Sequence, residues 1–282
     1  MTVQKFSVQE YAAPSVLYKY MPVQDWLLAM LKGQSLRFST RTSFNDPFDC
    51  RPSFRIGTSK KARDALHRGL KSRGLSPAKR IKAVSQATRM GDNFPTRQAT
   101  ENYLDRIGVL CLTSKWDNAL MWSHYGNHHS GICIGMRTNI GIFKTSMKVV
   151  YADELPIIEA PAVIEKELYD KVFLTKARCW AYEEEWRIIK AEISEHERDK
   201  QFREFCCFTT VEEARSLADH RGAGIYHFPN AAIESIILGM RISKDDEYFV
   251  RCAAKDAQLN IPIFKISPPE KTYNLSRIEC PA

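Results

Sequence analysis

The sequence predicts an α+β fold, with a mixed, mainly antiparallel sheet in a single domain and a basic helical insertion. Strand-like and helix-like patterns alternate irregularly, and the first forty residues already read as strand, helix and strand. Hydrophobic residues make up 44% of the chain and charged residues 26%, which is typical of a globular protein. A chain of 282 residues is long enough to bury a substantial core.

The N-terminal elements show these patterns clearly. Residues 16–20 (VLYKY) predict a short strand. Residues 22–33 predict a helix that begins with proline and ends at glycine, around an apolar stripe. In residues 35–39, Leu36 and Phe38 alternate with polar residues, so we expect a strand with one buried face.

The rest of the chain continues the mixture. Residues 116–131 predict a short helix or turn, and residues 180–193 pass from a helix-like acidic start into an alternating strand. The other predicted elements are strands over 107–114, 131–136, 147–153, 231–240 and 261–267, helices over 161–177 and 243–259, and a glycine-rich hairpin over 220–228.

Positive charge is concentrated in one segment. Residues 55–106 hold 13 Lys and Arg against 4 Asp and Glu, whereas the whole chain has a net charge of +8. We expect one or two basic helices over 59–90, broken at 74–77, as part of an insertion or lid. Such a segment can attract nucleic acid or another polyanion, and it is also compatible with a solvated helical face.

Several classes of protein are disfavoured. No apolar run is long enough for a membrane span, and the first residues lack a signal core, so we expect a soluble cytoplasmic protein. The eight cysteines form no C-x-x-C pair, which argues against structural zinc and a disulfide framework. No phosphate-binding loop, dinucleotide fingerprint or nucleophile elbow is present. The sequence does not indicate an oligomeric state.

The segment RFSTRTSFNDPFDC, residues 37–50, joins a strand to a polar turn. Asn45 and Asp46 favour a turn, because their side chains bond to nearby backbone. Phe44 and Phe48 are expected to anchor the turn in the core. Arg37 and Ser39 share the polar face of the preceding strand. The turn is therefore either a structural corner or one wall of a ligand site that uses Arg37, Ser39, Asn45 or Asp46.

The segment MWSHYG, residues 121–126, groups Trp122, His124 and Tyr125 before a strand. Two aromatic rings and an imidazole can stack on a planar ligand and donate to a phosphate or carbonyl. Trp122 also fits a core position. His124 and His128 have the spacing of two metal ligands on a helix, but Gly126 interrupts that helix and no metalloprotease glutamate accompanies them, so no metal is predicted.

The segment YEEEWRI, residues 182–188, contains the most specific acidic cluster. Strand alternation places Glu183, Glu185 and Arg187 on one face, with Trp186 and Ile188 on the other. Two carboxylates on one face repel each other unless a cation or a ligand compensates. One interpretation is pairing with nearby Arg or Lys residues. The other is a carboxylate that stabilises a developing positive charge in a cleft.

Three stretches together resemble the uncharacterised bacterial family catalogued as domain of unknown function 2971. They are LYKY…LRFSTRTSFNDPFDC, LMWSHYGNHHSGICIGM and KARCWAYEEEWRI, and IESIILGMRIS fits the family's downstream strand. The resemblance spans about residues 16–266. It implies a bacterial protein without an established activity, and the family's general setting suggests a toxin or a phage-defence effector.

The chain also resembles ADP-ribosyltransferases, whose cleft is built from split sheets. That resemblance implies three parts in chain order: a basic residue, Lys19 or Arg37; then Ser39 or the His124–Tyr125 pair; then the glutamate Glu185. No clear Ser-Thr-Ser element is present. The order of the parts is shared, and the mapping is an analogy.

This second resemblance implies NAD as a substrate and no certain cofactor. The nicotinamide ring would stack on Tyr125 or Trp122, Arg37 would hold the pyrophosphate, and Glu185 would stabilise the oxocarbenium-like transition state. Two alternatives stay open. One is a non-catalytic nucleic-acid-binding or regulatory module that uses residues 55–106. The other is a cofactor-independent hydrolase that pairs His124 with Asp46 or Glu185.

Overall fold

The computed structural model describes residues 12–56, 64, 66–68, 70–71, 74–90, 95–160, 166–268 and 271–280. The chain divides into two compact units. Within the described residues, the first unit comprises Thr40–Ile107 and Val150–Arg178, and the second comprises the chain up to Ser39, Gly108–Val149 and the chain from Cys179 onward.

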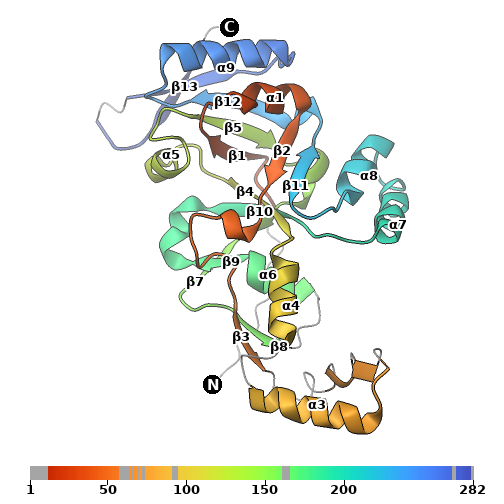
Figure 1. Cartoon of the computed structure of the whole chain (residues 1–282). Helices are drawn as coiled ribbons and strands as arrows, with labels where there is room; N and C mark the ends of the chain where they lie inside the picture. Colours follow the sequence, from red (N-terminus) through yellow and green to blue (C-terminus); the bar gives the residue numbers. More distant parts are fainter. Residues whose placement is uncertain are drawn as a thin grey trace. The chain divides into compact units, whose positions relative to one another are not determined.

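The second unit is built on an eight-stranded sheet with the strand order β14-β13-β12-β5-β1-β4-β10-β6 (Figure 1). Its strands are β1 Val16–Met21, β4 Gly108–Thr113, β5 Ile132–Arg137, β6 Met147–Lys148, β10 Glu185–Lys190, β12 Ile233–Leu238, β13 Ile263–Ser267 and β14 Ser276–Glu279. Only the β12–β13 pair among them is parallel, and the other pairs are antiparallel. The predicted α+β class with a mainly antiparallel mixed sheet is confirmed.

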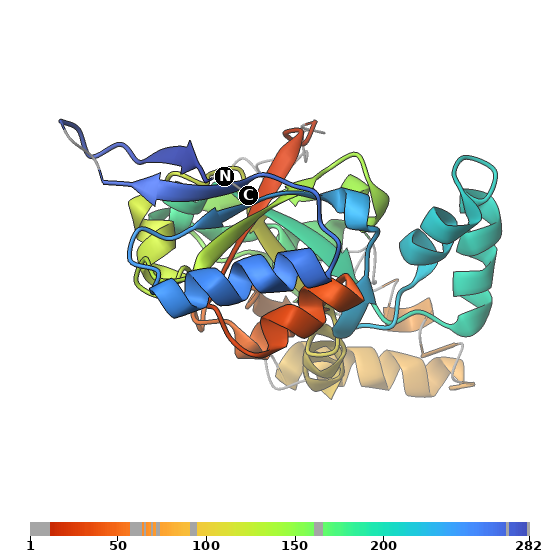
Figure 2. The same ribbon diagram turned by 90° about the horizontal axis from the view of Figure 1, so that it is seen from above.

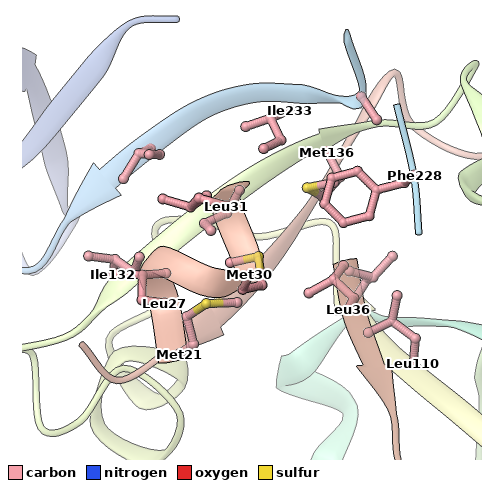
Figure 3. Packing of buried hydrophobic residues seen from close by; sticks show 14 of the residues in the cluster. Met21, Leu27, Met30, Leu31, Leu36, Leu110, Ile132, Met136, Phe228 and Ile233 are labelled. Carbon is pink, nitrogen blue, oxygen red and sulfur yellow. The ribbon is translucent and has the colours of Figure 1, made fainter. Parts of the chain in front are cut away.

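One face of this sheet carries the main core. Helices α1, Trp26–Gly33, and α9, Lys244–Asp256, lie side by side over it (Figure 2). Leu27 and Leu31 of α1 pack against Ile132 and Met136 of β5 within one buried cluster (Figure 3). Each face of a strand takes alternate residues, so Trp186 and Ile188 of β10 enter this core together, as the alternation predicted.

The opposite face of the sheet is covered partly by aromatic side chains. Helix α5, Ala119–His124, places Met121 and the fully buried Trp122 against Tyr18 and Tyr20 of β1. The Tyr20 and Trp122 rings meet edge to face, with centroids 5.0 Å apart. Because this cluster surrounds the end of α5, it fixes the position of the following loop.

A ribbon and a helical hairpin complete the second unit. Strand β2, Ser35–Phe38, pairs antiparallel with β11, Gly224–His227. Helices α7, Glu195–Phe205, and α8, Val211–Ala218, pack on each other, and α7 has no buried residue. The short helices η3, Gly141–Thr145, η4, Arg178–Glu183, and η5, Asn230–Ala232, lie between these elements in the sequence.

The first unit contains two parallel strand pairs. Strand β3, Ser53–Ile56, pairs with β8, Ile157–Ala160, and β7, Val150–Ala152, pairs with β9, Thr175–Ala177. The helices of this unit whose bounds lie within the described residues are η1 Arg41–Ser43, α3 Pro77–Met90, α4 Pro95–Leu104 and α6 Lys166–Phe173. Arg41 is buried and bonds to the carboxylates of Glu101 and Asp105, so it ties η1 to α4 and the residue that follows it.

Most of the predicted elements are present, and several bounds differ. The prediction of a helix over 161–177 was wrong at its C-terminal end, because α6 ends at Phe173 and residues 175–177 form β9; residues 161–165 lie outside the described residues. The predicted hairpin over 220–228 was also wrong, since its strand β11 pairs with β2. The predicted strand over 147–153 divides into β6 and β7.

Residues 59–90 are described only in part. Helix α3 confirms a basic helix within this range, and Gly74 adopts a positive φ of 78° before it, at the expected break. Whether residues 55–106 act as an insertion or lid stays a prediction. No helix within the described ranges has both the length and the apolar character needed to cross a membrane.

Candidate functional site

A row of residues crosses five strands on the aromatic face of the second unit. The strand register sets Glu185 of β10 opposite Thr113 of β4, Thr113 opposite Tyr18 of β1, Tyr18 opposite Gly135 of β5, and Gly135 opposite Ser235 of β12. Directly opposed residues point to the same face of a sheet. The register therefore gathers four polar side chains, from distant parts of the sequence, into one line.

The sheet opens between β1 and β4 next to this row. The register pairs β1 with β4 at Tyr18 and Thr113, whereas β1 and β5 pair along six residues. The Lys19 ammonium donates to the carbonyl oxygen of Cys111 at 3.1 Å, and Ser39 exchanges backbone bonds of 2.9 and 3.0 Å with Val109. A lysine side chain thus takes the place of a backbone partner on β4.

Glu185 begins β10 and lies 3% exposed beside Arg187, which is fully buried. Its two carboxylate oxygens accept from the Nε and Nη2 atoms of Arg187 at 2.7 and 2.9 Å. This two-point contact is the strong form of a carboxylate–guanidinium pair, and it offsets the cost of burying both charges. The predicted shared face of Glu185 and Arg187 is confirmed.

Glu183 lies two residues earlier and is 2% exposed. Its Oε1 atom accepts a hydrogen bond of 2.7 Å from the Tyr125 hydroxyl. Glu184, between the two buried glutamates, is exposed and has a φ of 43°. This left-handed conformation is rare in residues other than glycine, and it turns the chain where η4 meets β10. The carboxylates of Glu183 and Glu185 are therefore buried, whereas that of Glu184 between them faces water.

Four aromatic rings gather beside Glu183. His124 has ring centroids of Tyr125, Trp180 and Tyr182 at 6.1, 6.2 and 6.4 Å, and the Trp180 and Tyr182 centroids are 6.0 Å apart. His124 is exposed and the other three are half-buried. We call these four residues the aromatic cluster. Rings held at these spacings and open to water form a surface on which a planar ligand can stack.

Asn118 holds the two halves of the aromatic cluster together. Its Oδ1 atom accepts from the backbone N–H groups of Leu120 and Met121 and so caps the start of α5. Its Nδ2 atom donates to the Tyr182 carbonyl oxygen at 2.8 Å. One amide therefore sets the position of α5, which ends at His124, relative to η4.

Cys111 lies on β4 beside the Glu185–Arg187 pair. Burial, followed by the charge of Glu185, raises the pKa of its thiol well above the ordinary value. A thiol with a raised pKa is protonated at neutral pH and is a poor nucleophile. Cys111 therefore supplies apolar volume beside the charged pair.

The loop after α5 reverses the handedness of the backbone. Asn127, His128 and His129 have φ angles of 49°, 53° and 69° in succession. Since an α-helix needs negative φ angles, α5 ends at His124, and His128 does not follow one turn later on the same helix. Within the described residues, no group of three or more His, Cys, Asp or Glu side chains has a geometry suited to a metal ion.

The other predicted site residues are distributed as follows. Trp122 is fully buried, and its Nε1 atom donates to the Trp116 carbonyl oxygen. Arg37 is exposed on β2, and Ser39 is half-buried in its bridge to Val109. Asn45 and Asp46 belong to the first unit. The structure thus brings together Lys19, His124, Tyr125, Glu183, Glu185 and Arg187 within the second unit.

The NDPFD turn is organised by its own contacts. The Asp46 Oδ1 atom accepts from the Phe48 N–H at 2.9 Å, which closes the expected Asx turn. Asp49 lies in a buried ion pair with Lys176, at 3.6 Å. The expectation that Phe48 anchors the turn in the core was wrong: its side chain is 66% exposed, because the turn directs it into water.

Sequence reasoning missed Thr113, Asn118, Trp180 and Tyr182. The hydroxyl of Thr113 donates to the Glu183 carbonyl oxygen, so it anchors the start of the acidic segment. Trp180 and Tyr182 lie directly before the three glutamates, and this adjacency was the available signal. The contacts of Thr113 and Asn118 with the acidic segment could not be predicted, because those partners lie 70 and 64 residues away. The N-cap of α5 by Asn118 is local, and an asparagine before a helix was an available signal for it.

Comparisons with known proteins are consistent with this assembly. No curated protein and no solved structure matches the chain. The matched family segment begins at Met121 of α5 and ends at Ile188 of β10, so it includes all four members of the aromatic cluster and both buried glutamates. Residues 121–188 match the model of the family described as protein of unknown function (DUF2971), in agreement with the resemblance found in the sequence.

Proposed function

We propose that the second unit is an ADP-ribosyltransferase-like enzyme that cleaves the bond between nicotinamide and ribose in NAD. The observation that carries this proposal is the junction of two kinds of group at the start of β10. The Tyr125 hydroxyl bonds to Glu183, so the open aromatic cluster is connected to the buried carboxylates. Ring stacking and negative charge, the two properties that this reaction requires, therefore lie side by side.

The chemistry assigns separate roles to these groups. The nicotinamide ring stacks on the aromatic cluster, with Tyr125 nearest the carboxylates. The C–N bond breaks, its electron pair leaves with nicotinamide, and the ribose carbon becomes an oxocarbenium-like centre. Glu185 accepts a hydrogen bond from a ribose hydroxyl and stabilises the positive charge. Water or an acceptor side chain then attacks the carbon and loses its proton to solvent.

Access to Glu185 requires a local movement. Its carboxylate is 3% exposed and is held by Arg187, whereas Trp180 and Tyr182 of η4 are half-buried. We expect η4 to shift as the ring enters, so that a ribose hydroxyl can reach the carboxylate. Lys19, close to the row on β1, and Arg37, exposed on β2, are the cations proposed for the phosphates.

The direct test is NAD turnover by purified variants, measured as nicotinamide release. Glu185→Gln is expected to lower kcat about 10²–10³-fold, the usual loss when a preorganised partner of transition-state charge is removed. Glu184→Gln is the matched control, because that side chain is exposed and bonds to Ser114 at 2.7 Å. We expect the control to keep turnover close to that of the wild type.

The same assay decides between the proposal and its alternatives. Undiminished nicotinamide release by Glu185→Gln, in a sample with wild-type circular dichroism, would exclude the proposed role of Glu185. If the wild type releases no nicotinamide and instead hydrolyses esters or phosphoesters without NAD, the hydrolase that uses His124 is favoured. Comparison of the turnover of Glu183→Gln with that of Glu185→Gln shows which of the two buried carboxylates takes part in the reaction.

A second candidate function rests on the first unit. Helix α3 contains no acidic residue, its Lys79 and Lys82 side chains are exposed, and Ile81 between them is 64% exposed. A basic helix with an accessible apolar residue can bind the backbone of a nucleic acid. This observation favours a nucleic-acid-binding or regulatory role for residues 55–106, either as the whole function or as the means of presenting an acceptor.

Fluorescence anisotropy with a labelled single-stranded oligonucleotide tests this candidate. Binding should weaken steeply between about 50 and 200 mM salt, because counterions are released from the phosphates. The Lys79→Ala/Lys82→Ala variant should bind less tightly and with a shallower salt dependence. Lys244→Ala, an exposed lysine of α9, is the control. Binding that does not depend on salt, or equal binding by all three proteins, would reject the candidate.

A further inference from the structure

A groove lies in the second unit beside β11, away from the elements that carry the aromatic cluster. It has a volume of about 590 Å³, within the range of small-molecule sites. Helices α7 and α8, the C-terminal end of α1, and β11 with the residues that follow it supply its lining. The helical hairpin lies beside β11 in Figure 1.

Two arginines enter this groove from different helices. Arg198 of α7 is half-buried and Arg215 of α8 is exposed. Neither has an ion pair within the part of the chain that the structure describes. Nearby Arg221 is different, since Asp219 binds its guanidinium at 2.6 and 2.8 Å. Guanidinium groups without a carboxylate partner are available to an anionic ligand.

The base of the groove is aromatic and rigid. Tyr226 and Phe228 line it and are 2% and 4% exposed. The Tyr226 hydroxyl donates to the Gly222 carbonyl oxygen at 2.7 Å and accepts from the Arg221 N–H at 2.9 Å. These bonds fix the Tyr226 ring, and Phe38 and Arg221 pack on it at 4.7 and 5.4 Å. The two rings therefore offer the groove only a small, preformed apolar edge, over which a second ring can pack.

A buried ammonium group adds positive charge to this region. The Lys190 Nζ atom lies 5.3 Å from the centroid of the Tyr226 ring and donates to the carbonyl oxygens of Ser216 and Leu217 at 3.2 Å. Burial is the main cause that lowers the pKa of Lys190 to about 8, so the group is still largely charged at neutral pH. The positive charge of Lys190 lies close to the Tyr226 ring and attracts anions to the groove.

We propose that this groove binds a small ring compound carrying one phosphate group, with Arg198 and Arg215 on the phosphate and the ring over Tyr226 and Phe228. Planar guanidinium groups match the geometry of phosphate oxygens, and two of them from separate helices can bind one group. Three carboxylates also line the groove: those of Asp199 and Glu212, which are exposed, and that of Asp219, which is half-buried and bonded to Arg221. Their charge disfavours di- and triphosphates, which sets the limit at one phosphate.

The probe is adenosine 5′-monophosphate, with adenosine and inorganic phosphate as the two partial probes, and binding is measured by calorimetry on the full chain. We expect the monophosphate to bind at least tenfold more tightly than either partial probe, since only the whole compound engages both parts of the groove. Arg198→Ala and Arg215→Ala should each weaken its binding by about tenfold or more, as expected for a lost charge-assisted contact.

Matched variants make the outcome decisive. Arg203→Ala removes an exposed arginine of α7 that does not line the groove, and it should bind like the wild type. Tyr182→Ala, in the aromatic cluster, should also bind the monophosphate normally, which separates this groove from the proposed NAD site. Absence of monophosphate binding at millimolar concentration would overturn the proposal. Equal binding by the Arg198, Arg215 and Arg203 variants would overturn it as well.

Discussion

Two acidic turns of similar composition have different environments in this protein. In NDPFD, of the first unit, Asp46 closes a turn onto the backbone and Asp49 pairs with Lys176. In EEEW, of the second unit, Glu183 accepts a hydrogen bond from the Tyr125 hydroxyl and Glu185 pairs with the Arg187 guanidinium. Both carboxylates are buried, and the four rings of the aromatic cluster lie next to Glu183. The carboxylates of the first turn bond to the backbone of their own turn and to the distant Lys176, whereas those of the second turn lie beside the aromatic cluster.

This contrast shows that a concentration of carboxylates does not identify a site. The side chains around it decide its role. Phe48 of the first turn is 66% exposed, whereas the rings near Glu183 come from α5 and η4 together.

The largest effect is expected at Arg187. Arg187→Met leaves the buried Glu185 carboxylate without its partner, and this should lower the free energy of unfolding by about 3–5 kcal/mol, measured by urea denaturation. The double variant Glu185→Gln/Arg187→Met removes both charges and should recover much of that loss. If the double variant is as unstable as the single one, the pair is not the source of the effect.

Asn118 is expected to have the next largest effect, and two substitutions separate its two bonds. Asn118→Ala loses the helix cap and the bond to Tyr182, and it should cost about 1–2 kcal/mol in thermal unfolding. Asn118→Asp keeps the cap and replaces the donor with a carboxylate oxygen that repels the Tyr182 carbonyl oxygen. Because the cap is kept, it should unfold nearer the wild type than Asn118→Ala. Under the proposed function, the KM for NAD should rise, because η4 is no longer held against α5. An unchanged KM would reject this positioning role.

In the first unit, Asp46→Ala should lower the free energy of unfolding by about 1 kcal/mol, the usual contribution of one turn-closing hydrogen bond. Asp46→Asn is the matched control, because its amide oxygen can still accept from Phe48. Chemical denaturation measures both. A loss of NAD turnover with full stability would instead support the ligand-binding role predicted from the sequence, and the contrast between the turns would no longer hold.

The smallest effect is expected at Phe48. Phe48→Ser removes a ring that is 66% exposed, so the free energy of unfolding should change by no more than about 0.5 kcal/mol. Phe38→Ser, at a fully buried ring of β2, is the contrasting variant and should be severely destabilised. A large loss of stability for Phe48→Ser would show that the ring has a packing role after all.

Local patterns predicted much of the fold. Leu36 and Phe38 are buried as their alternation indicated, and Ser243 caps α9 by accepting from the Asp246 N–H at 3.0 Å. Both features depend on residues close in the sequence. The pairing of β11 with β2 could not be predicted in this way, because Tyr226 and Leu36 are brought together only by the folded chain. Helices α7 and α8 were not predicted either.

The candidate site was predictable in part for the same reason. Glu185 and Arg187 are two residues apart on a strand, so their contact followed from alternation. The bond from Tyr125 to Glu183 and the row through Thr113 and Tyr18 depend on strand register, which no local pattern specifies. The sequence places Trp180 just before the three glutamates, but its contact with His124 depends on the folded chain.

The three successive left-handed residues after α5 have a further consequence. Backbone bonds from the His129 N–H to Trp122, and from the Arg241 N–H to His129, maintain a conformation that isolated L-residues avoid. Because residues with positive φ angles cannot continue an α-helix, this loop keeps α5 from extending beyond its observed end, where the imidazole of His124 is exposed. His128→Gly would relieve the strain of the positive φ angle at this position, by up to about 1 kcal/mol. The stability of the loop and the accessibility of the His124 ring are therefore linked, although the loop need not contact any ligand.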